Sequence, residues 1–262
     1  MIDMSNYPSP EINAFKNEST ANIATYFKND DWKNLSLKWM IAGFKHKYMY
    51  NFECLGRPII QTPVDIVAIQ ELIWQTKPDL IIETGIAHGG SLILSASVLA
   101  LVDICEAIES GTTLDPRETK RKVLGIDIDI RKHNREAIEA HPMASRIQMI
   151  QGSSVAPEIV DQVRTIAKDY QRVLVCLDSN HTHEHVLAEL EAYAPLTTVG
   201  SYCVVFDTIV EDMPKEVFPD RPWGPGNNPK TAVWEYLKSH PEFVIDKSVE
   251  DKLLITVAVD CV

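Results

Sequence analysis

The sequence predicts an α/β protein with a mostly parallel central sheet, and two observations support this fold class. From residue 63 onward, apolar segments of strand length alternate with helical patterns, which is typical of βαβ units. These segments are almost continuously apolar, as expected for strands that helices cover on both faces. The expected strands are Leu80–Glu83, Val123–Asp127, Ile147–Gln151, Val173–Asp178 and Tyr202–Asp207.

Helical patterns separate these strands, and Pro63 stands at the first turn of the earliest one, where a proline is tolerated. Two further apolar segments, Phe243–Ile245 and Leu253–Val259, are close enough in the chain to pair as an antiparallel hairpin. With them, the expected sheet has seven strands and a C-terminal antiparallel strand. The expected helices are Pro63–Thr76, Gly90–Ile108, Arg131–His141, Ala156–Asp169, Thr182–Tyr193 and Thr231–His240.

Residues 1–62 differ from the rest and are expected to form an N-terminal helical segment before a domain of residues 63–262. Residues 11–28 and 32–48 have the mixed faces of two helices. The segment is rich in aromatic residues, including Trp32 and Trp39. They either pack on a core or form a lid or oligomer surface, and on the second interpretation we expect a homo-oligomer.

Composition limits the function classes. The 262 residues carry 25 basic and 37 acidic side chains, a formal charge of −12, which disfavours a non-specific nucleic-acid binder. Five scattered cysteines (Cys54, Cys105, Cys176, Cys203 and Cys261) indicate free thiols in a reducing compartment. Neither a signal peptide nor an uncharged apolar stretch of about 18 residues is recognised, so we expect no membrane span and a cytoplasmic location.

Four of the expected strands end on a carboxylate, namely Glu83, Asp127, Asp178 and Asp207. In open α/β sheets the ligand crevice lies beyond the carboxyl ends of the strands. Four acids gathered there are costly unless a cation or several hydroxyl donors meet them. This pattern therefore predicts a ligand site.

A glycine-rich loop follows the first of these acids and opens a helix. Its spacing is G-x-x-x-G-G over residues 85–90, which differs from the G-x-G-x-x-G of dinucleotide-binding folds and makes a nicotinamide enzyme the least favoured alternative. Glycines permit a tight turn and a close approach of backbone to ligand. An acid, a glycine loop and a helix in this order resemble motif I of the class I S-adenosylmethionine-dependent methyltransferases, whose loop wraps the methionine part of the cofactor.

The next two strand ends are candidates for the rest of that cofactor. Asp127 can accept hydrogen bonds from both ribose hydroxyls, although it lies 44 residues after Glu83 instead of about 20. A long helix and a surface loop over residues 110–117 account for the excess. Ser153 lies where methyltransferases contact adenine, while the same turn also fits a helix cap formed by Ser154.

Asp178 and Asp207, at adjacent strand ends, can hold Mg²⁺ together with water and substrate oxygens. Such an ion lowers the pKa of a bound hydroxyl. His181 is placed to take the hydroxyl proton, with His183 as the second candidate. Residues 181–185 also read H-x-H-x-H, but a helix is expected from Thr182, which disfavours a three-histidine zinc site. The spacing of a 2-His-1-carboxylate iron site is also missing.

Four segments (48–52, 55–61, 77–91 and 125–135) resemble the cephalosporin hydroxylase/rhamnosyl O-methyltransferase family over residues 45–259. The resemblance implies the Rossmann-like fold of class I methyltransferases and a Mg²⁺-assisted O-methyltransferase that uses S-adenosylmethionine. It places Glu83, Thr84, Gly85, His88, Gly89, Ser91, Asp127, Ser153 and Asp178 at cofactor positions. Asp178 also matches the first metal carboxylate, and His181 falls where catechol methyltransferases place a lysine base.

One departure concerns the last strand end, where relatives can offer two adjacent metal ligands and this chain has Phe206-Asp207-Thr208. The expected function is methylation of a hydroxyl on a sugar or a glycosylated small molecule. Trp223, in a Gly- and Pro-rich loop over residues 221–230, is a candidate for stacking on a sugar. Two alternatives stay open: an iron- and 2-oxoglutarate-dependent hydroxylase, and a non-catalytic subunit that binds the cofactor.

Overall fold

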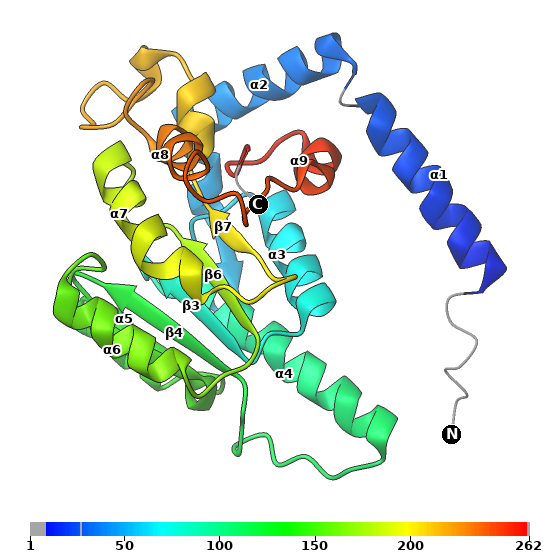
Figure 1. Cartoon of the computed structure of the whole chain (residues 1–262), viewed down its shortest axis with the longest axis vertical. Coiled ribbons are helices and arrows are strands. Elements are labelled where there is room, and N and C mark those ends of the chain that lie inside the picture. The colour runs from blue at the N-terminus through cyan, green and yellow to red at the C-terminus, as the bar shows by residue number, and fades with distance from the viewer. Residues whose placement is uncertain (1–8, 27, 261–262) are drawn as a thin grey trace.

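The computed structural model describes residues 9–26 and 28–260, and its centre is a parallel sheet with the strand order β5-β4-β3-β6-β7 (Figure 1). Because the strands run parallel, their carboxyl ends share one edge, and the chain order reverses between β3 and β6. Ligands bind at such a reversal in open α/β sheets. The strands are β3 (Leu80–Thr84), β4 (Lys122–Asp127), β5 (Ile147–Gln151), β6 (Val173–Leu177) and β7 (Cys203–Val205).

Strand register brings the expected acids to one level. Thr84 of β3 lies opposite Ile126 of β4 and Leu177 of β6. The acids beside these residues, Glu83, Asp127 and Asp178, therefore lie near the same edge. Every residue of β3 and β6 is buried, which confirms burial on both faces for these central strands, whereas the edge strand β5 has one buried residue, Ile150.

Helices cover both faces of the sheet: α3 and α4 pack together on one side, while α6 and α7 lie on the other (Figure 1). Thr62 caps α3 because its side-chain oxygen accepts the N–H of Asp65. The α4 helix starts after Gly89, whose φ is 84°. The helices are α3 (Pro63–Thr76), α4 (Gly90–Ser110), α5 (Lys132–Glu139), α6 (Pro157–Ala167), α7 (His183–Tyr193), α8 (Pro229–Tyr236) and α9 (Lys247–Leu253).

The expectation of seven strands is wrong, because the main sheet of the described residues has five and no antiparallel strand. Residues 243–245 form no strand, and α9 replaces the start of the second expected strand. The buried Asp65 carboxylate accepts hydrogen bonds from the Thr256 hydroxyl and the Val257 N–H. These side-chain contacts satisfy groups that a strand would pair with its neighbour.

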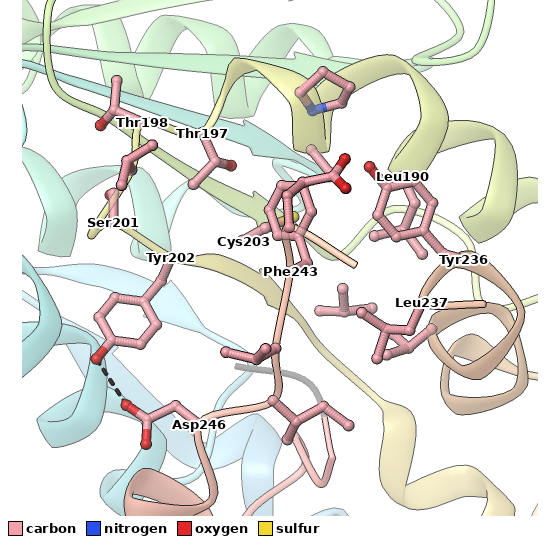
Figure 2. A pocket seen from close by; sticks show the side chains of 18 of the residues that line it. Leu190, Thr197, Thr198, Ser201, Tyr202, Cys203, Tyr236, Leu237, Phe243 and Asp246 are labelled. Carbon is pink, nitrogen blue, oxygen red and sulfur yellow. Dashed lines mark hydrogen bonds between the residues drawn. The ribbon is translucent and has the colours of Figure 1, made fainter. Parts of the chain in front are cut away.

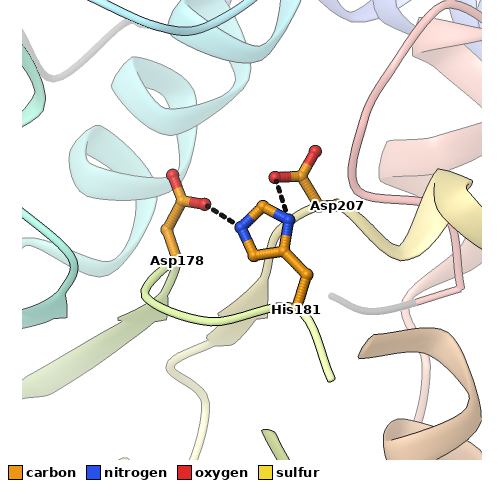
Figure 3. A group of neighbouring side chains, drawn as sticks. All are labelled: Asp178, His181 and Asp207. Atoms are coloured by element: carbon orange, nitrogen blue, oxygen red, sulfur yellow. Dashed lines mark ion pairs between the residues drawn. The ribbon is translucent and has the colours of Figure 1, made fainter. Parts of the chain in front are cut away.

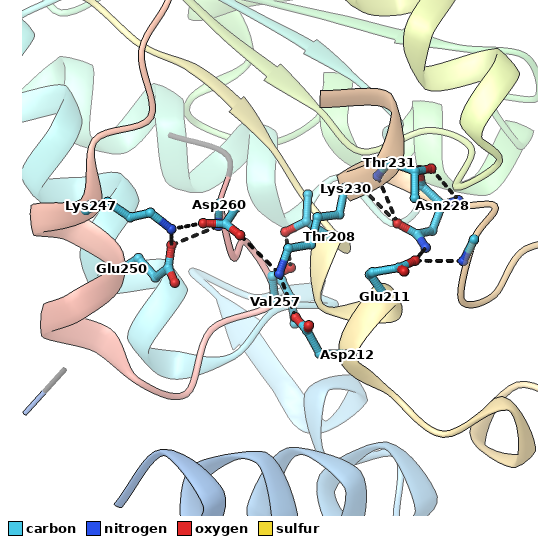
Figure 4. A network of polar contacts seen from close by, with 11 residues as sticks. Thr208, Glu211, Asp212, Asn228, Lys230, Thr231, Lys247, Glu250, Val257 and Asp260 are labelled. Atoms are coloured by element: carbon cyan, nitrogen blue, oxygen red, sulfur yellow. Dashed lines mark hydrogen bonds and ion pairs between the residues drawn. The ribbon is translucent and has the colours of Figure 1, made fainter. Parts of the chain in front are cut away.

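A cavity of about 680 Å³ lies beside β7, and residues 243–245 of the expected hairpin line it (Figure 2). Residues 257–260 are held by a polar network (Figure 4). In it Asp260 pairs with the buried Lys230 at 3.2 Å and also with Lys247, while Thr208 donates to the carbonyl oxygen of Val257. The network fixes the segment after α9 against the end of β7.

The N-terminal segment contains α1 (Pro10–Tyr26), α2 (Asp30–Lys45), the 3-10 helix η2 (Tyr48–Asn51) and a hairpin of β1 (Phe52–Cys54) and β2 (Arg57–Ile59). The two expected helices are present, although residue 27 lies outside the described residues, as does Cys261. A Cβ on Gly90 would lie 2.3 Å from the Pro58 carbonyl oxygen, so the hairpin packs directly on the start of α4. The expected boundary at residue 62 thus falls between segments in close contact.

Helix α4 is the one helix of the described residues that is long and apolar enough to cross a membrane, judged by length and composition. Its buried face includes Leu92, Ala96, Leu99 and Val102, and 39% of the apolar window is buried. The core helix of a globular protein passes the same test, so this helix does not decide whether the chain spans a membrane.

Candidate functional site

The glycine loop after β3 fits tightly against the end of β6. Gly85 has φ +90°, and a Cβ placed on it would lie 2.1 Å from the carbonyl oxygen of Asp178. The Asp178 N–H in turn donates to the carbonyl oxygen of Thr84 at 2.9 Å. The loop therefore sets the position of Asp178, and this close approach explains the glycine that the sequence places here.

We expect Gly85→Ala to destabilise the protein more than Gly200→Ala. Both glycines have positive φ (+90° and +82°), but a Cβ on Gly200 would meet no atom within 4 Å, so this substitution carries the conformational cost alone. That cost is about 1–2 kcal/mol, and the clash at Gly85 adds about 1–3 kcal/mol. Urea unfolding of both variants measures the difference, and equal losses of unfolding free energy would contradict the close approach.

Asp127 holds the same loop from the neighbouring strand. Its Oδ2 accepts the N–H groups of Ile86 at 2.8 Å and Ala87 at 3.3 Å, and Ala87 has φ +46°. The carboxylate thus stabilises a backbone conformation that is unfavourable for alanine. Ribose binding by Asp127, which was expected from the sequence, stays a prediction.

Two residues that the sequence did not single out complete the support of the loop. Arg57 of β2 donates to the carbonyl oxygen of His88 through Nε at 3.0 Å and through Nη2. Asn134 of α5 donates to the carbonyl oxygen of Ala87 at 2.9 Å. Arg57 stands in a segment that carried the family resemblance, but nothing local reveals a partner 31 residues away.

Glu83 lies beneath the loop and is 4% exposed. The hydroxyl of Ser91 donates to its carboxylate. Burial raises the pKa of Glu83 from 4.5 to about 7, and the Ser91 hydrogen bond opposes this rise. The acid is therefore placed to meet a cationic group of a ligand, whose charge would offset the cost of its own ionisation.

We expect Glu83→Gln to change the pH dependence of stability. A carboxyl whose pKa is raised on folding binds an extra proton in the folded state between pH 4.5 and 7. The free energy of unfolding therefore falls as pH rises through this window, by roughly 2–3 kcal/mol between pH 5 and pH 8. Urea unfolding at both pH values measures the effect. Glu83→Gln should lack this contribution, and parallel pH curves for the two proteins would contradict it.

Asp178, His181 and Asp207 lie together where β6 and β7 end (Figure 3). His181 Nε2 is 3.8 Å from Asp178 Oδ1, and its Nδ1 is 3.2 Å from Asp207 Oδ2. Burial, followed by the charge of Asp207, raises the pKa of Asp178 well above its ordinary value. Two carboxylates in this position repel each other, and a cation bound by both would offset that repulsion.

The donor set fits Mg²⁺. One ligand atom from each of the three side chains lies within 4.8 Å of the others. Gln61 lies beside the group, because its Nε2 donates to Asp178 Oδ2 at 3.4 Å, and its buried Oε1 has no partner among the described residues. Mg²⁺ prefers oxygen ligands. The two carboxylates therefore suit the ion, and His181 remains available for a proton.

The other expected residues lie apart from this group. The His183 ring nitrogen Nδ1 is 2.8 Å from the Thr231 hydroxyl of α8, so the structure does not bring His183 to the carboxylates. Ser153 lies at the end of β5, where adenine contact was expected. Within residues 9–26 and 28–260, the cluster contains one histidine and two carboxylates, which differs from the 2-His-1-carboxylate set of iron oxygenases.

A cavity of about 610 Å³ opens beside these carboxylates. Its wall contains a series of aromatic rings, in which Phe44 contacts Phe218, Phe218 contacts Trp223, and Trp223 lies over His181 with ring centres 5.0 Å apart. The N-terminal segment thus contributes to the cavity through Phe44 and Tyr50. An acceptor in this space would lie between the aromatic wall and the carboxylates.

Comparison with known proteins identifies relatives. The family described as Rhamnosyl O-methyltransferase/CmcI matches residues 46–262. The Rhamnosyl O-methyltransferase of Mycobacterium leprae (strain TN) is 29% identical over 226 residues, which cover 83% of this chain and 87% of that protein.

Among solved structures, one of cmcI with Mg and SAM has a TM-score of 0.48 and is 17% identical, covering 79% of this chain and 74% of that one. A second structure is that of the MycE methyltransferase from the mycinamycin biosynthetic pathway in complex with Mg and SAH. It has a TM-score of 0.43 and is 20% identical, covering 78% of this chain and 44% of that one.

Proposed function

Because the chain belongs to the Rhamnosyl O-methyltransferase/CmcI family, we propose that it transfers the methyl group of S-adenosylmethionine to a hydroxyl of a sugar or a glycosylated small molecule. One observation carries the proposal: Asp178, His181 and Asp207 gather beside a glycine loop on one side and an acceptor-sized cavity on the other. This arrangement suits a reaction in which a hydroxyl loses a proton while it faces a methyl donor.

The glycine loop would hold the cofactor. Thr84, Gly85, His88, Gly89 and Ser91 lie at the end of β3 and the start of α4, where a backbone can approach the methionine part. Asp127 and Ser153 lie at or just after the ends of the neighbouring strands β4 and β5, where they would contact ribose and adenine. Glu83 is a buried carboxyl beneath the loop, and a cationic group of the cofactor would favour its ionised form.

Asp178 and Asp207 would hold Mg²⁺, with Gln61 beside them. The ion would lower the pKa of an acceptor hydroxyl next to it. His181 then accepts the hydroxyl proton, since its ring stands between the two carboxylates and faces the cavity. The acceptor oxygen forms a bond to the methyl carbon, the carbon–sulfur bond breaks, and its electron pair stays on sulfur. S-adenosylhomocysteine and the methyl ether are the products.

The aromatic wall favours a ring-shaped acceptor. Trp223 lines the cavity, and Arg221 lies over its ring at 5.6 Å. Sugar rings stack their C–H faces on aromatic side chains while their hydroxyls remain free for polar contacts. We expect Trp223→Ala to raise the KM for the acceptor about tenfold, which corresponds to about 1.4 kcal/mol, without changing the affinity for S-adenosylmethionine. A change in cofactor affinity alone would contradict this position for the acceptor.

The direct test is methyl transfer from labelled S-adenosylmethionine to a panel of acceptors. The panel contains rhamnosides, other methyl glycosides and catechol, each with Mg²⁺ or with EDTA. Transfer to a glycoside that EDTA abolishes supports the proposal, whereas transfer to catechol alone contradicts the sugar acceptor. Turnover that requires Fe²⁺, oxygen and 2-oxoglutarate would support the hydroxylase alternative, and cofactor binding without transfer would support a non-catalytic subunit.

We also propose that the chain self-associates and acts in the cytoplasm. Trp32 and Trp39 of α2 are 42% and 38% exposed, which is unusual for tryptophan and suits an interface with a second copy. Light scattering of the full chain measures the mass of the assembly, and a monomer at micromolar concentration would contradict self-association.

A further inference from the structure

A row of polar side chains on α7 has no place in the mechanism above. His185, Glu189 and Tyr193 follow one another at intervals of four residues, so they share one face of the helix. Neither Glu189 nor Tyr193 has any exposed surface, and such complete burial is unusual for a carboxylate. Buried polar groups of this kind persist where their hydrogen bonds hold neighbouring segments in place.

The row contacts the loop that carries Asp178. The Ser179 hydroxyl donates to Glu189 Oε1 at 2.6 Å and lies 3.2 Å from His185 Nε2. Ser179 immediately follows Asp178 in the chain. Glu189 Oε2 has no hydrogen-bond partner among the described residues, and its Oε1 is also 3.5 Å from His185 Nε2, so loss of the Ser179 hydrogen bond would leave the buried carboxylate with the longer His185 contact. The orientation of this loop is therefore strongly determined.

The same row contacts the loop after β5. His185 Nε2 is 3.1 Å from the Ser154 hydroxyl, and the Tyr193 hydroxyl donates to the Ser154 carbonyl oxygen. Ser154 follows Ser153, the expected adenine contact. One helix face thus bonds to the loop on the metal side and to the loop on the cofactor side.

We propose that this face of α7 positions the two loops relative to each other, so that binding of S-adenosylmethionine and binding of Mg²⁺ favour each other. Glu189 and His185 are then positioning residues, which act through Ser179 and Ser154. The inference rests on the proposed function, since it requires both ligands to bind. Thermodynamic linkage requires each ligand to change the affinity for the other by the same factor, so titration with either ligand measures the coupling.

The experiment is calorimetric titration of the full chain with S-adenosylhomocysteine, without Mg²⁺ and with saturating Mg²⁺. We expect Mg²⁺ to tighten binding at least about fivefold in the unmodified protein. In Glu189→Gln and in Ser179→Ala, Mg²⁺ should tighten S-adenosylhomocysteine binding less than about twofold. Glu191→Gln is the matched control, because this carboxylate on the same helix is half-exposed and contacts His240 at 3.7 Å; it should keep the factor.

Each outcome decides the matter. Loss of coupling in both variants, with the control unchanged, supports the positioning role. The positioning role is overturned if Mg²⁺ tightens S-adenosylhomocysteine binding as much in Ser179→Ala as in the unmodified protein. It is also overturned if the unmodified protein binds both ligands and Mg²⁺ does not change its affinity for S-adenosylhomocysteine. Ser179→Ala also decides the case if Glu189→Gln fails to fold. Absence of S-adenosylhomocysteine binding to the unmodified protein contradicts the proposed function instead.

Discussion

Replacing Asp178 by asparagine is expected to reduce methyl transfer by about 10³-fold or more, which corresponds to about 4 kcal/mol of activation free energy. The change removes one of the two carboxylates that would hold Mg²⁺, and it also removes the negative charge beside His181. The side chain keeps its shape, so the glycine loop that packs on the Asp178 backbone should stay in place. Turnover of the best acceptor from the panel, together with Mg²⁺ affinity by calorimetry, measures the effect.

Asp129→Asn is the matched control for this variant. Asp129 also follows a strand at the same sheet edge, but its side chain is 71% exposed and pairs with Arg131 at 3.8 Å. A loss at Asp178 with no loss at Asp129 assigns the effect to the cluster and not to the overall negative charge. Full activity in Asp178→Asn, or unchanged Mg²⁺ affinity, would contradict the proposed metal ligand.

His181→Gln is expected to lower kcat by about 10²–10⁴-fold, the usual contribution of a general base. Glutamine cannot take up the hydroxyl proton, although it can still form hydrogen bonds with the neighbouring carboxylates. The affinity for S-adenosylmethionine should change little, because His181 lies toward the acceptor cavity. Steady-state kinetics and calorimetry on the same preparation separate the two quantities.

The comparison with His183→Gln decides which histidine is the base. His183 is bonded to Thr231, and its backbone N–H donates to Asn227, so we expect this variant to lose less than about tenfold. A larger loss of kcat at His183 than at His181 would contradict the assignment. Equal and small losses in both would show that neither histidine accepts the proton.

The central sheet was predictable from local sequence because its strands are short, apolar and separated by helices. The strands expected at Val123–Asp127 and Ile147–Gln151 agree with β4 and β5 to within one residue. The prediction of a C-terminal hairpin was wrong for a physical reason. Leu253–Val259 has the composition of a strand, but Asp65, almost 200 residues away in sequence, bonds to Thr256 and Val257 and fixes another conformation. Local patterns contain no information about such a partner.

The part of the site formed by residues at strand ends was predictable from the sequence. Asp178 and Asp207 were expected to lie together because adjacent parallel strands end at one edge, and they do. The family resemblance is confirmed. Arg57, Gln61 and Glu189 were missed because each acts on a segment distant in sequence or on a neighbouring turn, and a single arginine, glutamine or buried glutamate has no distinctive local pattern.

The most direct test of the central claim is calorimetric titration with S-adenosylmethionine, with and without Mg²⁺, on the unmodified chain and on Asp127→Ala. Saturable binding to the unmodified chain, with loss of affinity in Asp127→Ala, is the predicted result, because Asp127 holds the cofactor loop through Ile86 and Ala87. Absence of binding under either condition would contradict the methyltransferase function.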